Sequence, residues 1–229
     1  MNAATRAERP GEHAAPSLWM NRWSRPVGRF LDHALYATDV VGADTVPVTG
    51  PVIFAANHIS ALDGPVLVGA APRFMNVLVK REMFTGFLGT VLHYSGQLPV
   101  NRAGDRRALQ TAKAVLEAGR CVGILPEGTR GGGDVAAISG GVAWLALATG
   151  APVVPVAVLG TRRTGERVGH IPRLRRRFTV HFGAPVPITT DAGLTGRARM
   201  EAATETIRVA LASHVSAAVA ASGVALPAD

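Results

Sequence analysis

Short apolar runs alternate with longer amphipathic segments along most of this chain. Apolar runs of strand length occur at residues 52–57, 75–80, 97–102, 121–128, 152–160 and 177–183. Segments of helical composition or spacing lie at residues 63–71, 81–96, 105–119, 138–149 and 196–220. Strands that alternate with helices of this length are typical of an α/β fold with a mainly parallel sheet. We therefore expect a single α/β domain with a mainly parallel mixed sheet flanked by helices.

The ends of the chain differ from this pattern. Residues 1–16 are polar and predict a flexible tail, without the apolar stretch of a signal peptide. Residues 17–37 place tryptophan and phenylalanine among arginines, which is typical of an amphipathic helix at a membrane interface, with Pro26 as the expected break. An ordinary helix packed on the domain is the open alternative. The rest of the pattern places the main domain at residues 38–222 and a C-terminal tail at 223–229.

Composition supports a globular interior. The chain has 229 residues, of which 48% are hydrophobic, so one domain of this size can bury a sizeable core. Its single cysteine, Cys121, lies in an apolar run, which predicts a buried strand residue, no internal disulfide and a reducing compartment. The uncharged stretch from residue 135 to 161 is interrupted by glycine and proline, which favours a helix, a turn and a buried strand over a membrane span.

The formal net charge of +8 predicts attraction to polyanions, whether phospholipid, nucleic acid or a phosphorylated substrate. Nucleic acid is disfavoured, because the arginines are not interleaved with stacking aromatic residues and no recognition motif is present. Seven arginines lie between residues 162 and 177, opposed by Glu166. This arginine tract could be a surface that docks on anionic headgroups, a site for the phosphates of coenzyme A or for an acidic acyl carrier protein, or a solvated loop between two strands.

Candidate chemistry is concentrated in the segment AANHISALDGP at residues 55–65. Five residues on a regular helix correspond to about 500° of rotation, so His58 and Asp63 would not share a helix face. The spacing instead favours a histidine in the loop that leaves a strand and an aspartate in the first turn of the next helix, where Pro65 is tolerated. A histidine oriented in this way can act as a general base toward a hydroxyl.

The same residues have a plainer interpretation. Asp63 could cap the helix, Asn57 could form a turn, and His58 could be a loop histidine without a functional role. From the residues alone both interpretations stay open. A metal site is less favoured, because the other histidines are scattered along the chain rather than placed at ligand spacing. They are His13, His33, His93, His170, His181 and His214.

Four ordered blocks carry a resemblance to a known family. They are NHISALD at 57–63, GQLPVNR at 96–102, LPEGTRG at 125–131 and APVVPVAVLGT at 151–161. In this order they resemble the motifs of the 1-acylglycerol-3-phosphate acyltransferases, in the glycerophospholipid acyltransferase superfamily, over about residues 40–190. The resemblance implies a glycerol-3-phosphate acyltransferase-like fold.

The resemblance also implies roles for two residues of the first block. The family's histidine removes the proton from a glycerol hydroxyl while that hydroxyl attacks an acyl thioester, and His58 occupies this place. The aspartate holds the imidazole ring and stabilises its positive charge, which is the role expected of Asp63.

The expected substrate-binding residues come from three of the blocks. Arg102 and Arg130 are expected to bind the phosphate of the acyl acceptor, and Glu127 to order Arg130 or to hydrogen-bond the glycerol. Gly128 would let the backbone approach the substrate closely. Asn57 and Thr129 complete this set.

Simpler alternatives exist for these loop residues. Arg102 could pair with Asp105, and Arg130 could be a solvated charge. The glycines at 131–133 lack the Walker pattern and predict a flexible loop near the site. Two departures from the family limit what can be transferred: Asn101 stands where an acid is usual, and Ser139 lies in a segment where many members carry a basic residue.

The resemblance thus implies transfer of a fatty acyl chain from acyl-CoA or acyl carrier protein to 1-acylglycerol-3-phosphate, giving phosphatidic acid, with no metal or prosthetic group. An enzyme of the same mechanism acting on another lysophospholipid or polar lipid alcohol, and a noncatalytic protein that binds membrane surfaces, remain open. We expect a cytoplasmic protein, peripheral on the inner face of the cell membrane, without a nucleic-acid partner.

Overall fold

The computed structural model describes residues 14–101, 105–128, 132–189 and 193–228. Within them, seven strands form one sheet in the order β1-β7-β6-β2-β5-β3-β4. All neighbouring strands are parallel except β6 and β7, which are antiparallel. The strands are β1 Ala37–Val41, β2 Val52–Ala56, β3 Met75–Lys80, β4 Leu98–Val100, β5 Cys121–Ile124, β6 Val153–Leu159 and β7 Arg177–Phe182. The predicted α/β domain with a mainly parallel mixed sheet is confirmed.

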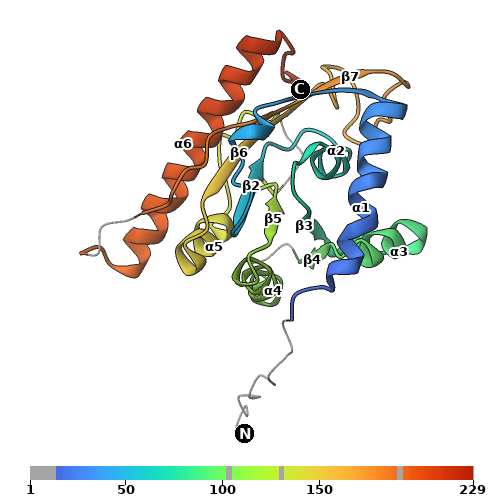
Figure 1. Cartoon of the computed structure of the whole chain (residues 1–229). Helices are drawn as coiled ribbons and strands as arrows, with labels where there is room; N and C mark the ends of the chain where they lie inside the picture. The colour runs from blue at the N-terminus through green and yellow to red at the C-terminus, as the bar shows by residue number, and fades with distance from the viewer. Residues whose placement is uncertain (1–13, 102–104, 129–131, 190–192, 229) are drawn as a thin grey trace, which may run out of the picture.

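Helices cover both faces of this sheet. Figure 1 shows α4, α5 and α6 on one face and α1 and α2 on the other, with α3 lying beyond α1. Their bounds are α1 Leu18–Phe30, α2 Asp63–Ala70, α3 Gly86–Tyr94, α4 Arg106–Glu117, α5 Gly141–Thr149 and α6 Gly196–Ser222. Shorter turns are a π-helix at Leu31–Leu35 and 3-10 helices at Ala43–Thr45 and Arg81–Met83. In the described part of the chain, no helix combines the length and apolar character needed to cross a membrane.

The central strand β2 shows how the sheet divides the core. All five of its residues are buried, and successive side chains of a strand point to opposite faces of the sheet. Ile53 and Ala55 belong to the core cluster that includes residues of α4, α5 and α6. Val52, Phe54 and Ala56 belong to the cluster that includes residues of α2. An uninterrupted apolar run is what a parallel strand covered on both faces requires.

The prediction of a helix break at Pro26 is wrong. Pro26 lies inside α1, which continues through Phe30 and then widens into the π-helical turn. Proline costs a helix one hydrogen bond, but tertiary packing can hold the helix together across it. Here α1 packs on α2 at very short range, because a Cβ added to Gly28 would lie 2.8 Å from the Cα of Gly69.

Two other segments differ from the expected pattern. Strand β1 was not predicted, and it pairs in parallel with β7 at the edge of the sheet, where only Thr38 of its five residues is buried. A short edge strand with a single buried position shows no clear alternation of apolar and polar residues. After α6, Val224 and Leu226 pack against the core in the segment expected as a tail.

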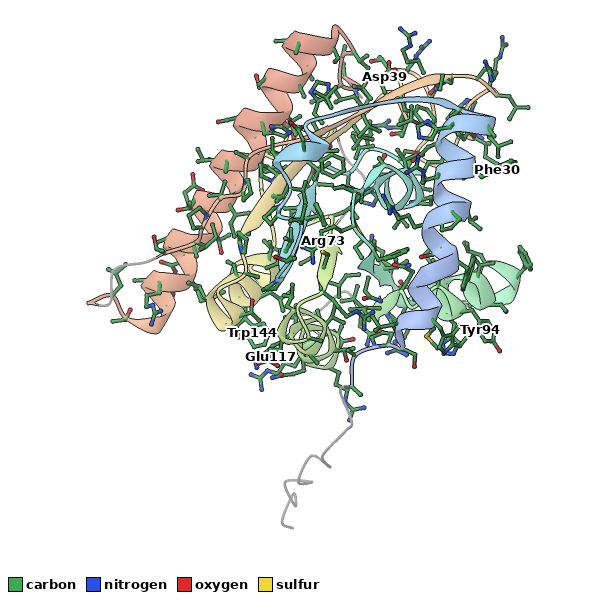
Figure 2. The ribbon with its side chains drawn as sticks, viewed as in Figure 1. Phe30, Asp39, Arg73, Tyr94, Glu117 and Trp144 are labelled. Atoms are coloured by element: carbon green, nitrogen blue, oxygen red, sulfur yellow. The ribbon has the colours of Figure 1, made fainter. Side chains whose placement is uncertain are left out.

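Cys121 is buried in β5, as expected, and burial raises the pKa of its thiol to about 11. The end of α3 is joined to α1, since the indole nitrogen of Trp23 donates to the carbonyl oxygen of Tyr94 at 2.9 Å. Figure 2 shows Tyr94 beside the lower end of α1. The first helix therefore contacts both α2 and α3.

Candidate active site

The ordered sequence blocks meet at one edge of the sheet. His58 follows the carboxyl end of β2, the strand that lies between β5 and β6. Glu127 follows β5 and Thr161 follows β6. Because the carboxyl ends of neighbouring parallel strands open at the same edge, residues far apart in sequence come together there.

His58 and Asp63 form the centre of this site. The Nδ1 atom of His58 lies 2.9 Å from Oδ2 of Asp63. His58 lies in the loop after β2 and Asp63 is the first residue of α2, so the predicted loop-and-first-turn arrangement is confirmed. An ionised carboxylate only accepts hydrogen bonds, so Nδ1 carries the proton and Nε2 can accept one from a hydroxyl. The His58 side chain is 14% exposed, whereas that of Asp63 is fully buried.

Asp63 is held by three further donors. The backbone nitrogens of Ile59 and Ser60 each donate to Oδ2 at 2.7 Å. The hydroxyl of Thr161 donates to Oδ1 at 2.6 Å. Four hydrogen bonds and a position at the start of α2 let a buried carboxylate remain charged. Thr161 is not among the site residues expected from the sequence, where its only signal is its place at the end of the fourth block.

The side chain of Asn57 is hydrogen-bonded to a neighbouring strand. Its side chain is fully buried, its amide nitrogen donates to the carbonyl oxygen of Val158 at 3.2 Å, and its amide oxygen accepts from the backbone nitrogen of Val158 at 2.7 Å. Both ends of the amide are therefore bonded to β6. In this structure Asn57 ties the end of β2 to β6, and this bonding fixes the backbone that carries His58.

Glu127 contacts the backbone of the histidine. Its Oε1 atom accepts from the backbone nitrogen of His58 at 2.8 Å, a contact that the sequence does not predict. Burial raises the pKa of Glu127 to about 7; the hydrogen bond from His58 lowers it, while the negative charges of Asp134 and Asp63 raise it further. The carboxyl therefore changes charge near neutral pH, directly beside the histidine.

Two glycines shape the loop after β5. Gly128 has a φ of 69° and its backbone nitrogen donates to the carbonyl oxygen of Leu125, so a left-handed turn follows the strand. Gly133 has a φ of 75°, and a Cβ there would lie 2.4 Å from Ile59 Cγ2 and 2.9 Å from Asn57 Nδ2. A larger residue at 133 would press on the loop that holds His58.

Three predicted substrate-binding residues, Arg102, Thr129 and Arg130, lie outside the described residues. The two departures from the family pattern do have described partners. Asn101 donates through its amide to Asp105, the residue that caps α4, and accepts from Arg81. Ser139 donates its backbone N–H to the carbonyl oxygen of Pro126 at 2.8 Å.

Lys80 adds a cation to the same edge of the sheet. It is the last residue of β3, a strand that lies between β5 and β4, and it is paired with Val100 of β4. Lys80 is not among the binding residues expected from the sequence. Across the described ranges, no group of three or more His, Cys, Asp or Glu side chains is placed to hold a metal ion.

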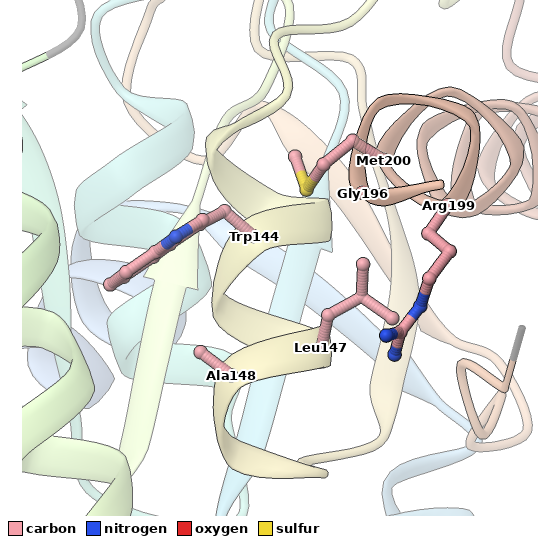
Figure 3. A pocket seen from close by; sticks show the side chains of 6 residues that line it. All are labelled: Trp144, Leu147, Ala148, Gly196, Arg199 and Met200. Carbon is pink, nitrogen blue, oxygen red and sulfur yellow. The ribbon is translucent and has the colours of Figure 1, made fainter. Parts of the chain in front are cut away.

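A shallow pocket of about 270 Å³ lies elsewhere, between α5 and the start of α6. Figure 3 shows the side chains that line it, contributed by these two helices. They are Trp144, Leu147, Ala148, Gly196, Arg199 and Met200. None of the predicted site residues is among them, so this pocket is separate from the His58 site.

Comparison with known proteins identifies the family. The model of the family described as Acyltransferase matches residues 37–159, more than half of the chain. This chain belongs to the acyltransferase family. The matched region contains the His58–Asp63 pair, the Glu127 loop and nearly all of the fourth block. The region matched by the family model therefore contains most of the elements that the structure brings together at the carboxyl edge of the sheet.

Individual relatives of this chain carry a more specific name. The 1-acyl-sn-glycerol-3-phosphate acyltransferase of Borreliella burgdorferi is 34% identical over 127 residues, which cover 53% of this chain and 51% of that protein. The protein of the same name from Bacillus subtilis is 28% identical over 171 residues, covering 73% of this chain and 83% of its own. Several curated relatives are matched over only about half of their length or less.

A solved structure shares the fold of this chain. It is the crystal structure of the 1-acyl-sn-glycerophosphate (LPA) acyltransferase PlsC from Thermotoga maritima, which aligns with a TM-score of 0.62. The alignment covers 83% of this chain and 78% of that chain at 21% sequence identity. At this identity the likeness shows the fold.

Proposed function

We propose that this acyltransferase moves a fatty acyl chain from a thioester, acyl-CoA or acyl carrier protein, to the free hydroxyl of 1-acylglycerol-3-phosphate, giving phosphatidic acid. The observation that carries the proposal is the His58–Asp63 pair, with Nδ1 held by a buried carboxylate at 2.9 Å. The relatives named 1-acyl-sn-glycerol-3-phosphate acyltransferase support the choice of acceptor.

The chemistry needs one base. Nε2 of His58 takes the proton of the acceptor hydroxyl while the oxygen attacks the thioester carbonyl carbon and forms a tetrahedral intermediate. When the intermediate collapses, the carbon–sulfur bond breaks and the thiol leaves with the proton returned by His58. Asp63 stabilises the imidazolium between these two steps. The base and the thioester suffice for this reaction, so we assign no metal or prosthetic group.

The acceptor phosphate requires cations near the base. Arg102 and Arg130 are the proposed ligands, because planar guanidinium groups bind phosphate through two hydrogen bonds. Lys80 stands at the end of β3 on the same edge and can add a point charge. Glu127 supports the base indirectly, since it holds the backbone nitrogen of His58.

We also propose that the protein docks on the inner face of the cell membrane through one surface, the α1–tract surface. It consists of the exposed apolar side chains of α1 and its π turn together with the arginine tract, in which five of the seven arginines are exposed and Arg162 is buried. The exposed apolar residues are Leu18, Trp19, Val27, Phe30 and Leu35 of the helical segment and Ile171 and Leu174 of the tract. Figure 2 shows Phe30 on the outer side of α1.

Two hydrogen bonds support treating these parts as one surface. The backbone nitrogen of Arg175 donates to the carbonyl oxygen of Leu35 at 2.7 Å, and the Tyr36 hydroxyl donates to that of Pro172 at 3.4 Å. The tract therefore lies against the end of the helical segment. Basic residues near an anionic bilayer each contribute about 1 kcal/mol of attraction, and apolar side chains between them add burial.

The enzymatic proposal is tested by a transfer assay. Purified protein is mixed with oleoyl-CoA and 1-acylglycerol-3-phosphate, and both phosphatidic acid and free thiol are followed beside His58→Ala. We expect equal amounts of lipid product and thiol from the wild type, and a loss of about 10²–10⁴-fold in the folded variant. Undiminished transfer by His58→Ala would rule out His58 as the base. If the folded wild type transfers nothing from oleoyl-CoA, acyl carrier protein donors and other lipid acceptors are tested next.

The docking proposal is tested with vesicles. Sedimentation with phosphatidylglycerol vesicles should exceed that with phosphatidylcholine vesicles and should weaken as salt rises. The double variant Phe30→Ser, Leu174→Ser should bind less at every salt concentration. Val48, which is 86% exposed in the loop before β2, offers a matched control through Val48→Ser. Equal binding by the double variant and this control would refute the assigned surface.

A further inference from the structure

The two oxygens of the Asp63 carboxylate have unequal surroundings. Oδ2 accepts from Nδ1 of His58 and from the backbone nitrogens of Ile59 and Ser60, all within the same loop. Oδ1 accepts from the hydroxyl of Thr161, which is 98 residues away at the end of β6. Both Asp63 and Thr161 are fully buried. The hydroxyl is thus the contact that joins the carboxylate to a different strand.

We propose that Thr161 is a positioning residue for the His58–Asp63 pair, because its hydroxyl fixes the rotation of the carboxylate so that Oδ2 faces Nδ1 of His58. The inference rests on the proposed function for its kinetic consequence only. Its structural consequence, the orientation of the imidazole, can be measured without substrate.

The direction of the hydrogen bond follows from the chemistry of the groups. A charged carboxylate has no proton to give, so the hydroxyl of Thr161 is the donor. A β-branched side chain has few χ1 rotamers, so the donor keeps its direction. Without the hydroxyl, Oδ1 would be a buried charged acceptor that has lost this donor. The lost hydrogen bond costs free energy, and it favours rotation of the carboxylate toward other donors.

The backbone places Thr161 for this contact. Gly160 directly follows β6 and has a φ of 86°, a conformation that favours glycine. A Cβ at Gly160 would lie 2.9 Å from the carbonyl oxygen of Arg177 on the neighbouring strand β7. The turn that brings Thr161 to Asp63 therefore depends on the residue before it.

The test compares Thr161→Val, which removes the donor at similar volume, with Thr161→Ser, which keeps it. The first measurement is the proton NMR signal of His58 Nδ1–H, identified among the seven histidines by its absence in His58→Gln. We expect the signal to shift or broaden in Thr161→Val, because the carboxylate no longer holds one orientation, and to return in Thr161→Ser.

The second measurement is steady-state acyl transfer. Losing a hydrogen bond to a charged group should lower kcat by about tenfold or more in Thr161→Val, with KM nearly unchanged, and Thr161→Ser should recover most of it. Thr149→Val is the matched control, because it removes a threonine hydroxyl that donates to Leu145 within α5. This control should leave both the His58 signal and kcat unchanged.

An unchanged His58 signal in folded Thr161→Val would overturn the proposal, whatever the activity. Should that variant fail to fold, Thr161→Cys carries the same test, since a thiol is a much weaker donor of similar size. A normal His58 signal in Thr161→Cys would also overturn it. If the wild type proves inactive with every substrate but the signal responds as expected, the proposed function fails while the positioning role stands.

Discussion

Among the described residues, two aspartates are completely buried: Asp63 at the start of α2 and Asp32 in the π turn after α1. Asp63 accepts four hydrogen bonds. Within the described ranges, neither oxygen of Asp32 has a hydrogen bond of good geometry. Burial raises the pKa of Asp32 to about 8, and the Thr38 hydroxyl and Arg29 lower it only in part. Equal burial therefore produces a charged, oriented carboxylate in one region and a neutral acid in the other.

The two aspartates lie toward opposite ends of one short helix. Asp63 begins α2, while Oδ2 of Asp32 faces Gly69 near the end of it, where an added Cβ would come within 2.3 Å. The donors around Asp63 belong to the loop after β2 and to Thr161 in the turn after β6, and they orient the carboxylate toward His58. Asp32 lies at the close contact between α1 and α2, where the helices pack tightly and few polar partners are near.

The largest expected effect comes from replacing the charged member of the pair. Asp63→Asn removes the negative charge beside His58 and leaves a single accepting oxygen, so the imidazolium that forms during transfer is no longer stabilised. We expect kcat for acyl transfer to fall by about 10²–10⁴-fold. Steady-state kinetics with a thermal melt as folding control checks this. A variant that kept more than half of its activity would show that the two aspartates differ less than their contacts indicate.

Asp32→Asn should affect the pH dependence of stability and leave kcat unchanged. The folded protein keeps the Asp32 proton up to about pH 8, whereas the unfolded chain loses it near pH 4. The contribution of Asp32 to the free energy of unfolding is therefore complete below about pH 4. It decreases as pH rises to about 8, by a few kcal/mol in order of magnitude. The neutral amide removes this decrease.

Urea denaturation of both proteins at pH 5, 6, 7, 8 and 9 measures the effect. The difference in unfolding free energy should move in favour of Asp32→Asn as pH rises through this window. A difference that stays constant with pH would mean that Asp32 is already ionised in the folded protein.

Gly69→Ala tests the packing around Asp32. The new Cβ would meet Asp32 Oδ2 at 2.3 Å and the carbonyl carbon of Gly28 at 2.4 Å, so α1 and α2 must separate. Overpacking of this kind costs about 1–3 kcal/mol. Gly64→Ala in the same helix is the matched control, because its Cβ would meet nothing within 4 Å. Chemical denaturation should show a loss of stability for the first variant and none for the second; equal stability would contradict such a close helix contact.

The smallest effect is expected from Glu127→Gln, which tests whether the charge of this buried acid affects His58. With a pKa of about 7, Glu127 is mostly neutral below that pH, and an amide oxygen can also accept from the backbone nitrogen of His58. Activities of wild type and variant should coincide at pH 6 and diverge by about twofold above pH 8, where only the wild type carries the charge. Parallel pH–activity curves across this range would show that the charge state of Glu127 has no bearing on His58.

The features predictable from the sequence depend on neighbours along the chain. The placement of His58 in a loop and Asp63 in the first helical turn follows from a five-residue spacing and from Pro65. Most strand and helix bounds follow from apolar periodicity in the same way. Pro26 shows where local rules fail, because the proline predicts a break that the packing of α1 on α2 prevents.

The sequence by itself determined the α/β pattern, the local His58–Asp63 geometry and the family, because these depend on residue order and short-range backbone rules. The tertiary structure alone decided that Thr161 supports Asp63, that Glu127 holds the backbone of His58 and that Asn57 bonds to β6. It also decided that Asp32 is buried without donors of good geometry among the described residues. These contacts join residues whose distance in the chain carries no information about proximity; strand order in the sheet brings them together, and burial then sets the charge that each side chain can hold.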